Sequence, residues 1–280
     1  MPDPVIILGL GFTTQHLARR LRERDIPVYA AVRAPERFAE FQRLGVHLSP
    51  LRAADLPQRA VLIHSIPPLA EPDKSQIRAL VCAAEPRRIV YISSTGVYGA
   101  QTEVSENSQA IPDDEKGLAR MDEEGWISGK AATQGSTGPT RPWSSLILRS
   151  AAIYGPGRGI HVRVREGKLP RGAGGVVSRI HVDDLAALLD AGIVSELEGA
   201  WPVADDLPVA SAEVAEWCAK LMAISVPGED APVFPVAGRH VDGKKIRELL
   251  GIELRYPTYC TGIPASLSVE SRARLGESRA

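Results

Sequence analysis

The sequence has few cysteines, no long apolar run and no recognisable targeting segment. Its three cysteines, Cys82, Cys218 and Cys260, are scattered, which is typical of reduced thiols and argues against a disulfide framework. No pair of cysteines or histidines has zinc-ligand spacing, so no metal site is expected. No apolar run approaches the ~20 residues that a membrane helix needs, and the N-terminus lacks the regions of a signal peptide. We therefore expect a cytoplasmic protein without a membrane partner.

Net charge is also nearly absent. The chain has 33 basic and 34 acidic residues, a formal net charge of −1. No broad basic field is present to attract nucleic acid, so no nucleic-acid partner is expected. The apolar share of 44% is that of an ordinary globular protein. A length of 280 residues allows one large α/β domain, or one domain with a small second lobe.

Short apolar runs alternate with helix-like segments along much of the chain. Strands are predicted at residues 5–8, 28–32, 46–48, 60–65, 88–93, 144–149 and 201–204. Helices are predicted at residues 14–24, 35–44, 74–84, 114–128, 185–194, 210–223 and 241–250. Strands that alternate with helices at this spacing indicate βαβ units with right-handed crossovers. The predicted fold class is therefore α/β, with a doubly wound parallel sheet.

The first predicted strand is followed by Gly-Leu-Gly-Phe-Thr-Thr, which opens the first helix. Gly9 permits a tight turn, and Gly11 lets a pyrophosphate approach the backbone at the N-terminus of the helix, where Phe12 and Thr13 lie. Thr14 takes the third position, usually Gly or Ala, and is expected to crowd the helix slightly against the strand. These residues predict a dinucleotide site.

The end of the second predicted strand distinguishes between two cofactors. An NAD site usually has an acidic residue there for the ribose 2′-hydroxyl, whereas this chain has Arg33, with Arg37 one helical turn further on. A guanidinium can bind a 2′-phosphate through two parallel hydrogen bonds. The sequence therefore favours NADP(H) over NAD.

Three further segments occur in a recognisable order. Residues 93–99 read Ser-Ser-Thr-Gly-Val-Tyr-Gly, residues 154–158 read Tyr-Gly-Pro-Gly-Arg, and residues 178–184 read Ser-Arg-Ile-His-Val-Asp-Asp. Together they resemble the extended short-chain dehydrogenase/reductases, which include the NAD(P)-dependent epimerases and dehydratases. The resemblance covers roughly residues 5–255. It implies a Rossmann-type fold and a small-molecule substrate with a carbonyl or sugar-like group.

The resemblance also implies roles for side chains at two strand ends. In the family, a hydroxyl three residues before Val-Tyr-Gly hydrogen-bonds the reacting substrate oxygen, and here that residue is Ser94. The end of the fourth strand lies along the cofactor ribose in relatives. That position implicates Ser65, Ile66 and Pro67 in cofactor binding, together with Ser93.

The substrate side of the site is expected to involve residues from all three matched segments. Tyr98 is expected to line or pack against the pocket. Arg158 is a candidate for holding an anionic group of the substrate. Arg179 and His181 are candidates for facing the substrate, with His181 as a general acid or as a hydrogen-bonded structural residue. One of the two aspartates after His181 is expected to cap the following helix.

The Tyr-x-x-x-Lys pair that normally transfers the proton in this family is missing. In one alignment Trp126 replaces the Tyr and Lys130 is the Lys. In the other, which we prefer, Lys116 takes the Tyr position and Arg120 takes the Lys position, with Glu124 one helical turn later and able to pair with Arg120. Neither alignment supplies a phenolic acid, so the proton donor stays open.

The matched segments divide the chain into two predicted units. A Rossmann-type NAD(P)-binding domain is expected at residues 1–154 and about 178–204. A small substrate lobe is expected at about 155–177 and 205–265. Residues 266–280 are polar and are expected to fray.

Two functions remain open from the sequence. The first is an atypical NADP(H)-dependent oxidoreductase or epimerase, with NAD as the other possible cofactor. The second is a cofactor-binding sensor or scaffold that lost turnover together with its tyrosine. Relatives often form homodimers through paired helices beside the sheet, so a homodimer is compatible with either function.

Overall fold

A parallel seven-stranded sheet forms the centre of the molecule. The computed structural model describes residues 2–51, 55–129, 142–167, 175–224 and 238–277. The strand order is β11-β7-β5-β4-β1-β2-β3, and every pair is parallel. The strands are β1 (Val5–Leu8), β2 (Val28–Val32), β3 (Val46–Pro50), β4 (Val61–His64), β5 (Arg88–Ser94), β7 (Ser144–Ser150) and β11 (Gly199–Val203). The predicted doubly wound parallel sheet is confirmed.

Helices cover both faces of the sheet, which explains why its central strands are apolar throughout. All four residues of β1 are buried. Ile7 packs into one core cluster and Ile6 into another, because successive side chains point to opposite faces. The helices on the Ile7 face are α1 (Phe12–Arg22), α2 (Ala39–Arg43), α6 (Val182–Val194) and α8 (Lys244–Leu250). The helices on the Ile6 face are α3 (Asp73–Ala84) and α4 (Glu115–Ser128).

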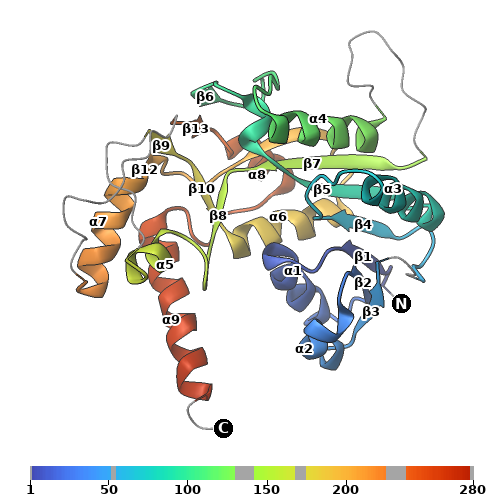
Figure 1. Ribbon diagram of the computed structural model, residues 1–280, viewed down its shortest axis with the longest axis horizontal. Coiled ribbons are helices and arrows are strands. Elements are labelled where there is room, and N and C mark those ends of the chain that lie inside the picture. The colour runs from blue at the N-terminus through green and yellow to red at the C-terminus, as the bar shows by residue number, and fades with distance from the viewer. Residues whose placement is uncertain (1, 52–54, 130–141, 168–174, 225–237, 278–280) are drawn as a thin grey trace.

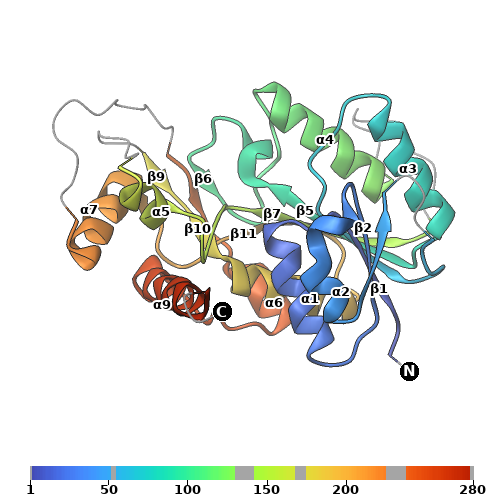
Figure 2. The ribbon, with the colours of Figure 1, turned by 60° about the horizontal axis from the view of Figure 1, so that its bottom comes forward.

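A smaller group of elements lies beyond the carboxyl ends of the strands and has its own apolar core. It consists of β8 (Ala152–Tyr154), α5 (Ile160–Arg165), β9 (Val176–Val177), β10 (Arg179–His181), β12 (Val209–Ala210), α7 (Ser211–Met222) and α9 (Tyr259–Glu277). Figures 1 and 2 both show α5, α7 and α9 together at the end of the molecule opposite β1 and β2. We call this group the lobe.

Several short elements follow or flank the strands of the sheet. The 3-10 turns η1 (Pro35–Phe38) and η2 (Thr95–Tyr98) follow β2 and β5, and β6 (Glu103–Val104) pairs in parallel with β13 (His240–Val241). Arg239, just before β13, donates hydrogen bonds to the carbonyl oxygens of Thr95, Gly99 and Gln101. This arginine therefore fixes the turn after β5.

The C-terminal segment differs from the sequence expectation. Residues 266–277 were predicted to fray, but they form the greater part of α9, and Ser266 is 1% exposed. The helix is retained because its buried side packs on β8 and α5, contacts that the polar composition does not reveal. Helix α8, expected in the lobe, places Ile246 in the main core beside the sheet. Within the described residues, no helix is both long and apolar enough to cross a membrane.

Candidate functional site

The turn after β1 has the geometry that an anion-binding helix N-terminus requires. Gly9 has φ +83°, and a Cβ there would lie 3.0 Å from Ile66 Cγ1, so glycine is needed at this position. Gly11 is the N-cap of α1, and no side chain hydrogen-bonds there. A Cβ on Gly11 would meet no atom within 4 Å. The open space and the free N–H groups at the helix start fit a cofactor pyrophosphate.

Two hydroxyls hold this turn together. Thr14 is fully buried, and its Oγ1 donates to the Gly9 carbonyl oxygen at 2.7 Å. Ser65 Oγ donates to the same oxygen at 2.7 Å and lies 3.0 Å from the Leu8 oxygen. Thr14 thus supports the turn, which corrects the expectation that it merely crowds the strand. The Ser65 hydroxyl is likewise directed at β1 rather than outward.

The other predicted cofactor residues surround the carboxyl ends of β1, β2 and β4. Phe12 and Thr13 form the first turn of α1, and Ile66 and Pro67 directly follow β4. The strand order of the sheet reverses between β1 and β4. Dinucleotides bind at such a reversal in open parallel sheets.

Arg33 and Arg37 are exposed beyond β2. Neither makes an ion pair or side-chain hydrogen bond with any described residue, in contrast to Arg19 on α1, which binds Glu40 at 3.0 Å. Both guanidinium groups are therefore available to a ligand at the edge where a cofactor ribose would lie.

Ser94 ends β5 with a hydroxyl that is only partly used. The side chain is half-buried, and its Oγ accepts a hydrogen bond from the Gly96 N–H at 3.2 Å. Among the described residues it has no acceptor for its own hydrogen. The Ser94 O–H is thus able to donate to a substrate oxygen beside the strand end.

Ser93 and Tyr98, in contrast, belong to a buried network beneath Ser94. Ser93 Oγ donates to Glu124 Oε1 at 2.6 Å. Arg149 donates from Nε and Nη2 to the same carboxylate, with Nη2 2.7 Å from Oε2. Arg149 Nη1 also donates to Tyr98 Oη at 3.3 Å. The Tyr98 side chain is 1% exposed, and this burial raises its pKa. The Ser93 and Tyr98 side chains therefore make internal contacts; Tyr98 packs, which is one of its two expected roles, and the contact of Ser93 with the cofactor stays a prediction.

Helix α4 carries both alternatives for the missing tyrosine pair. Arg120 Nη1 donates to Tyr91 Oη at 3.0 Å and to the Ile92 carbonyl oxygen at 3.1 Å, close to the strand end. Lys116 is exposed one turn earlier. Trp126 packs instead against Trp143, with ring centroids 5.8 Å apart, in the core on the Ile6 face.

These contacts favour the alignment that uses Arg120. Lys130, of the other alignment, lies outside the described residues. The pair between Arg120 and Glu124 that the spacing allowed does not form, because Glu124 binds Arg149 instead. Burial raises the pKa of Tyr91 to about 12, so Arg120 donates to a neutral phenol.

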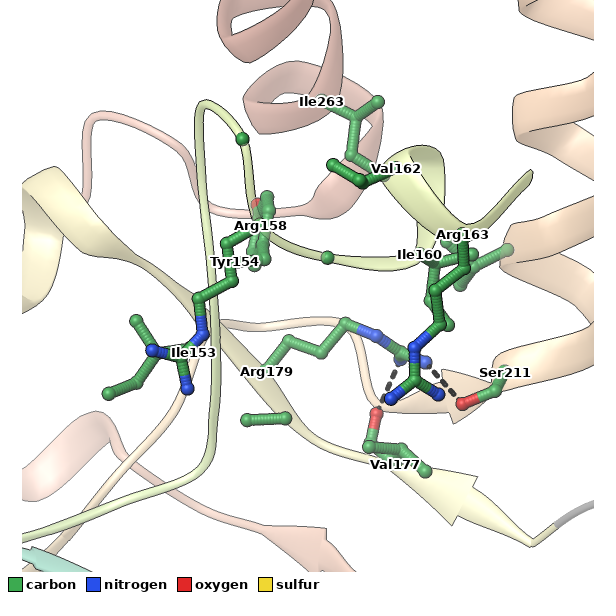
Figure 3. Close-up of a pocket in the computed structure, with 14 residues that line it drawn as sticks. Ile153, Tyr154, Arg158, Ile160, Val162, Arg163, Val177, Arg179, Ser211 and Ile263 are labelled. Carbon is green, nitrogen blue, oxygen red and sulfur yellow. Dashed lines mark hydrogen bonds between the residues drawn. The ribbon is translucent and has the colours of Figure 1, made fainter. Parts of the chain in front are cut away.

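The lobe contains a cavity of about 470 Å³ between β8, β10, α5, α7 and α9. Arg158, Arg163 and Arg179 line it from three different segments (Figure 3). The Arg158 guanidinium also lies over the Phe12 ring, 5.2 Å from its centroid. The cavity therefore adjoins the predicted cofactor turn, and the predicted substrate residues Arg158 and Arg179 lie together.

His181 does not line this cavity, and its two ring nitrogens have protein partners. Nδ1 accepts from the Asp183 N–H at 3.2 Å, which caps α6, and Nε2 lies 3.2 Å from Ser266 Oγ. Burial lowers the pKa of His181 to about 4. The geometry thus fits the structural alternative and not the general acid.

The prediction that Asp183 or Asp184 caps α6 is wrong. His181 takes the capping position. Asp183 binds His16 at 2.6 Å, and Asp184 accepts hydrogen bonds from the backbone N–H groups of Arg255 and Tyr256.

Several residues around the cavity had no sequence signal. Arg163 sits on the six-residue helix α5, Ser211 begins α7 and Ile263 lies on α9. They are 48 to 52 positions apart along the chain, and none belongs to a motif. The sequence has several arginines near residues 158–165. Their number alone does not identify the arginines that face a ligand, because Arg165 pairs with Glu270.

Comparisons with known proteins extend these observations. No protein-family model matches the chain. A 78-residue segment is 40% identical to a "3-diazoavenalumate denitrifying reductase" from a Streptomyces species, a match that spans 25% of this chain and only 26% of that protein. A conserved protein of unknown function from Silicibacter pomeroyi is 28% identical over 95% of this chain and 98% of its own, with a TM-score of 0.78.

Two further solved structures carry functional descriptions. A protein from Methylobacillus flagellatus described as an NAD-dependent epimerase/dehydratase is 24% identical, with coverage of 96% and 99% and a TM-score of 0.71. MoeE5, solved with UDP-glucose and NAD, is 19% identical, with coverage of 97% and 99% and a TM-score of 0.75. The chain has the fold of the NAD-dependent epimerases and dehydratases.

Proposed function

We propose that this protein is an NADP(H)-dependent oxidoreductase or epimerase that acts on a carbonyl group of a small molecule. The observation that carries the proposal is the contrast between two neighbouring hydroxyls. Ser93 Oγ is bound to Glu124, whereas the Ser94 hydrogen has no acceptor among the described residues. An unused donor at the carboxyl end of a central strand is in the right place to hold a reacting oxygen.

The residues of the glycine turn are proposed to hold the cofactor. Gly9 and Gly11 fit a pyrophosphate at the start of α1, and Arg33 and Arg37 fit a 2′-phosphate. When bound, the nicotinamide supplies or accepts hydride. A reductive direction is supported by the name of the Streptomyces relative.

Ser94 is proposed to orient the substrate by donating a hydrogen bond to its carbonyl oxygen. The Ser94 oxygen accepts from the Gly96 N–H, which leaves the hydroxyl hydrogen to donate to a substrate oxygen. Arg120 is a positioning residue, because it binds the β5 backbone at Ile92 and so fixes the strand end that carries Ser94. The proton for the reduced oxygen comes from water or from another group, since no tyrosine stands at the usual position.

Cofactor titration tests the first part of the proposal. The purified chain is titrated with NADPH and with NADH by calorimetry. We expect NADPH to bind tens of times more tightly, and Arg33→Ala to remove most of that difference while leaving NADH affinity nearly unchanged. Arg43→Ala, on the exposed side of α2, is the matched control. Tighter binding of NADH would contradict the NADP(H) preference.

Turnover tests the second part. The NADPH-loaded protein is screened for hydride transfer to a panel of carbonyl compounds and nucleotide sugars by loss of absorbance at the reduced nicotinamide band. We expect Ser94→Ala to lower kcat/KM by about 10²–10³-fold, as for loss of a hydrogen bond to a reacting oxygen. NADPH affinity is expected to be unchanged. Tight cofactor binding with no turnover on any compound would favour the sensor or scaffold.

A further inference from the structure

The lobe cavity is lined by three arginines, none of which forms an ion pair with a described residue. Arg158 and Arg163 are exposed at its rim. Neither forms an ion pair within the described ranges. In contrast, Arg165, the last residue of α5, binds Glu270 on α9. Arg158 is directed toward Phe12, whereas the guanidinium groups of Arg163 and Arg179 lie near each other in Figure 3, and two neighbouring positive charges repel one another unless an anion lies between them.

Arg179 gives the strongest indication of a ligand. It is 4% exposed, and its three hydrogen bonds all go to uncharged acceptors: the carbonyl oxygens of Val177 and Val209 and the Ser211 hydroxyl. A guanidinium has five N–H donors, so Nε–H and one Nη2 hydrogen have no partner in the described part of the chain. Asp205 is close enough to act on the charge of Arg179, but no carboxylate of the described residues forms an ion pair with it, and a buried cation usually has a direct counter-charge.

Most of the other side chains that line the cavity are apolar. Ala152, Ile160, Val162, Val214 and Ile263 contribute to it (Figure 3). Apart from the arginines, the side chains with polar atoms are Tyr154 and Ser211. Tyr154 Oη points to the Thr258 carbonyl oxygen at 3.3 Å, and Ser211 already accepts from Arg179.

The side chains of the described lining residues therefore offer few acceptors for sugar hydroxyls. No Asp, Glu, Asn or Gln side chain is among the described lining residues. A ligand rich in hydroxyl groups would lose hydrogen bonds to water here without replacing them. An apolar ligand with one anionic end would satisfy both the arginines and the walls.

The position of the cavity connects it to the proposed chemistry. Ser94 pairs in register with Ser150, and Ala152, two residues further along the chain, lines the cavity. On the other side, Arg158 covers Phe12 at the start of the cofactor helix. The cavity is thus bordered by one segment that continues from the strand paired with Ser94 and by an arginine that contacts the cofactor helix.

We infer that the cavity binds a small organic anion, with an apolar body and a carboxylate or phosphate head held by Arg163 and Arg179, rather than a nucleotide sugar. The inference deepens the proposed function by naming its substrate class. Binding of the anion does not depend on the proposed function, whereas its reduction or oxidation by the cofactor does. A volume of about 470 Å³ suits a ligand of this size.

Direct binding measurements test the inference. The full-length protein, with and without NADPH, is titrated by calorimetry with cinnamate, phenyl phosphate, the neutral amide cinnamamide, and UDP-glucose. We expect at least one of the two anions to bind about tenfold or more tightly than cinnamamide and more tightly than UDP-glucose. The tighter anion identifies the head group, and either result supports the inference.

Two variants locate the binding site. Arg163→Gln is expected to remove the preference for the anion over cinnamamide, without affecting folding, because the Arg163 side chain is exposed and unpaired. Val162→Phe is expected to weaken anion and amide alike by filling the apolar part of the cavity. Arg43→Gln, far from the cavity on α2, controls for the loss of one positive charge.

The outcomes separate this inference from the proposed function. UDP-glucose binding more tightly than both anions, or an anion preference that survives Arg163→Gln, would overturn the inference even if NADPH binding and hydride transfer are observed. Anion binding without NADPH binding would instead leave the inference intact and contradict the proposed function.

Discussion

At the end of β5, two adjacent serines have opposite environments. Ser93 is buried and bound to Glu124, whereas Ser94 is half-buried and its hydrogen has no acceptor in the described part of the chain. The difference arises because successive strand residues face opposite sides of the sheet. Glu124 lies on the Ser93 side, and Arg149 neutralises it there. This pair keeps a negative charge out of the space around Ser94.

The Glu124–Arg149 pair leads to a prediction at the residue scale. Glu124→Gln leaves the Arg149 guanidinium buried without a counter-charge, and removing one partner of a buried pair costs about 3–5 kcal/mol. We expect a loss of about 3 kcal/mol or more in the free energy of unfolding, measured by urea denaturation.

Asp122→Asn on the same helix is the matched control. Its carboxylate is 49% exposed and binds Arg78 at 2.8 Å, and exposed pairs contribute about 0–1 kcal/mol. Equal unfolding midpoints for the two variants would show that the buried pair does not stabilise the strand end.

At the scale of elements, helix α9 closes the lobe against β8 and α5. Gly262 allows the close approach, because a Cβ there would lie 2.2 Å from Tyr154 Oη. Further along the helix, Glu270 accepts hydrogen bonds from the Gly157 N–H at 2.7 Å and, at 3.0 Å, pairs with His161 Nε2. The C-terminal helix therefore holds the cavity loop from two points.

The tight contact at Gly262 predicts the effect of one added methyl group. In Gly262→Ala the new Cβ displaces Tyr154, a ring that is 3% exposed, and overpacking of this kind costs about 1–3 kcal/mol. We expect the melting temperature to fall by several degrees and protease cleavage near α9 to become faster. Ser268→Ala, on the exposed side of α9, is expected to change neither. A Gly262→Ala protein as stable as the parent would mean that α9 docks more loosely than described.

For the molecule as a whole, Asp205 marks the junction between the sheet and the lobe. It follows β11, and its N–H donates to the Arg179 carbonyl oxygen at 2.6 Å. The side chain is 3% exposed, and Oδ2 has no hydrogen-bond partner among the residues that the structure describes. Burial raises the pKa of Asp205 to about 7. The junction is therefore sensitive to pH.

The sign of this sensitivity follows from proton linkage. The folded pKa of about 7 exceeds the unfolded value of about 3.9, so between these values the folded state binds the proton more tightly. The stability contribution is complete below about pH 4 and is lost as the pH rises through 7. Asp205→Asn removes this dependence and keeps the Oδ1 acceptor for the Leu207 N–H.

We expect the stability advantage of Asp205→Asn over the parent protein to grow by about 2–3 kcal/mol between pH 5 and pH 8. Urea denaturation at the two pH values measures it. Asp206→Asn, at the neighbouring carboxylate that binds Arg247, controls for the loss of one negative charge. An Asp205→Asn advantage that is the same at both pH values would contradict the assignment of a raised pKa.

The sequence alone determined the parallel sheet, the glycine turn and the position of Ser94. These features depend on neighbouring residues: four consecutive apolar side chains form β1, and Gly9 adopts a positive φ that other residues rarely adopt. Local patterns of this kind are readable without knowing what packs against them.

Only the tertiary structure decided which polar side chains remain free for a ligand. Glu124 pairs with Arg149 and not with Arg120. His181 contacts Ser266, which lies on a helix that the sequence did not predict. Arg158, Arg163 and Arg179 meet at one cavity because α5, α7 and α9 fold around it. Such contacts depend on packing between distant segments, since the energy of a buried charge is set by the partners that the fold brings to it.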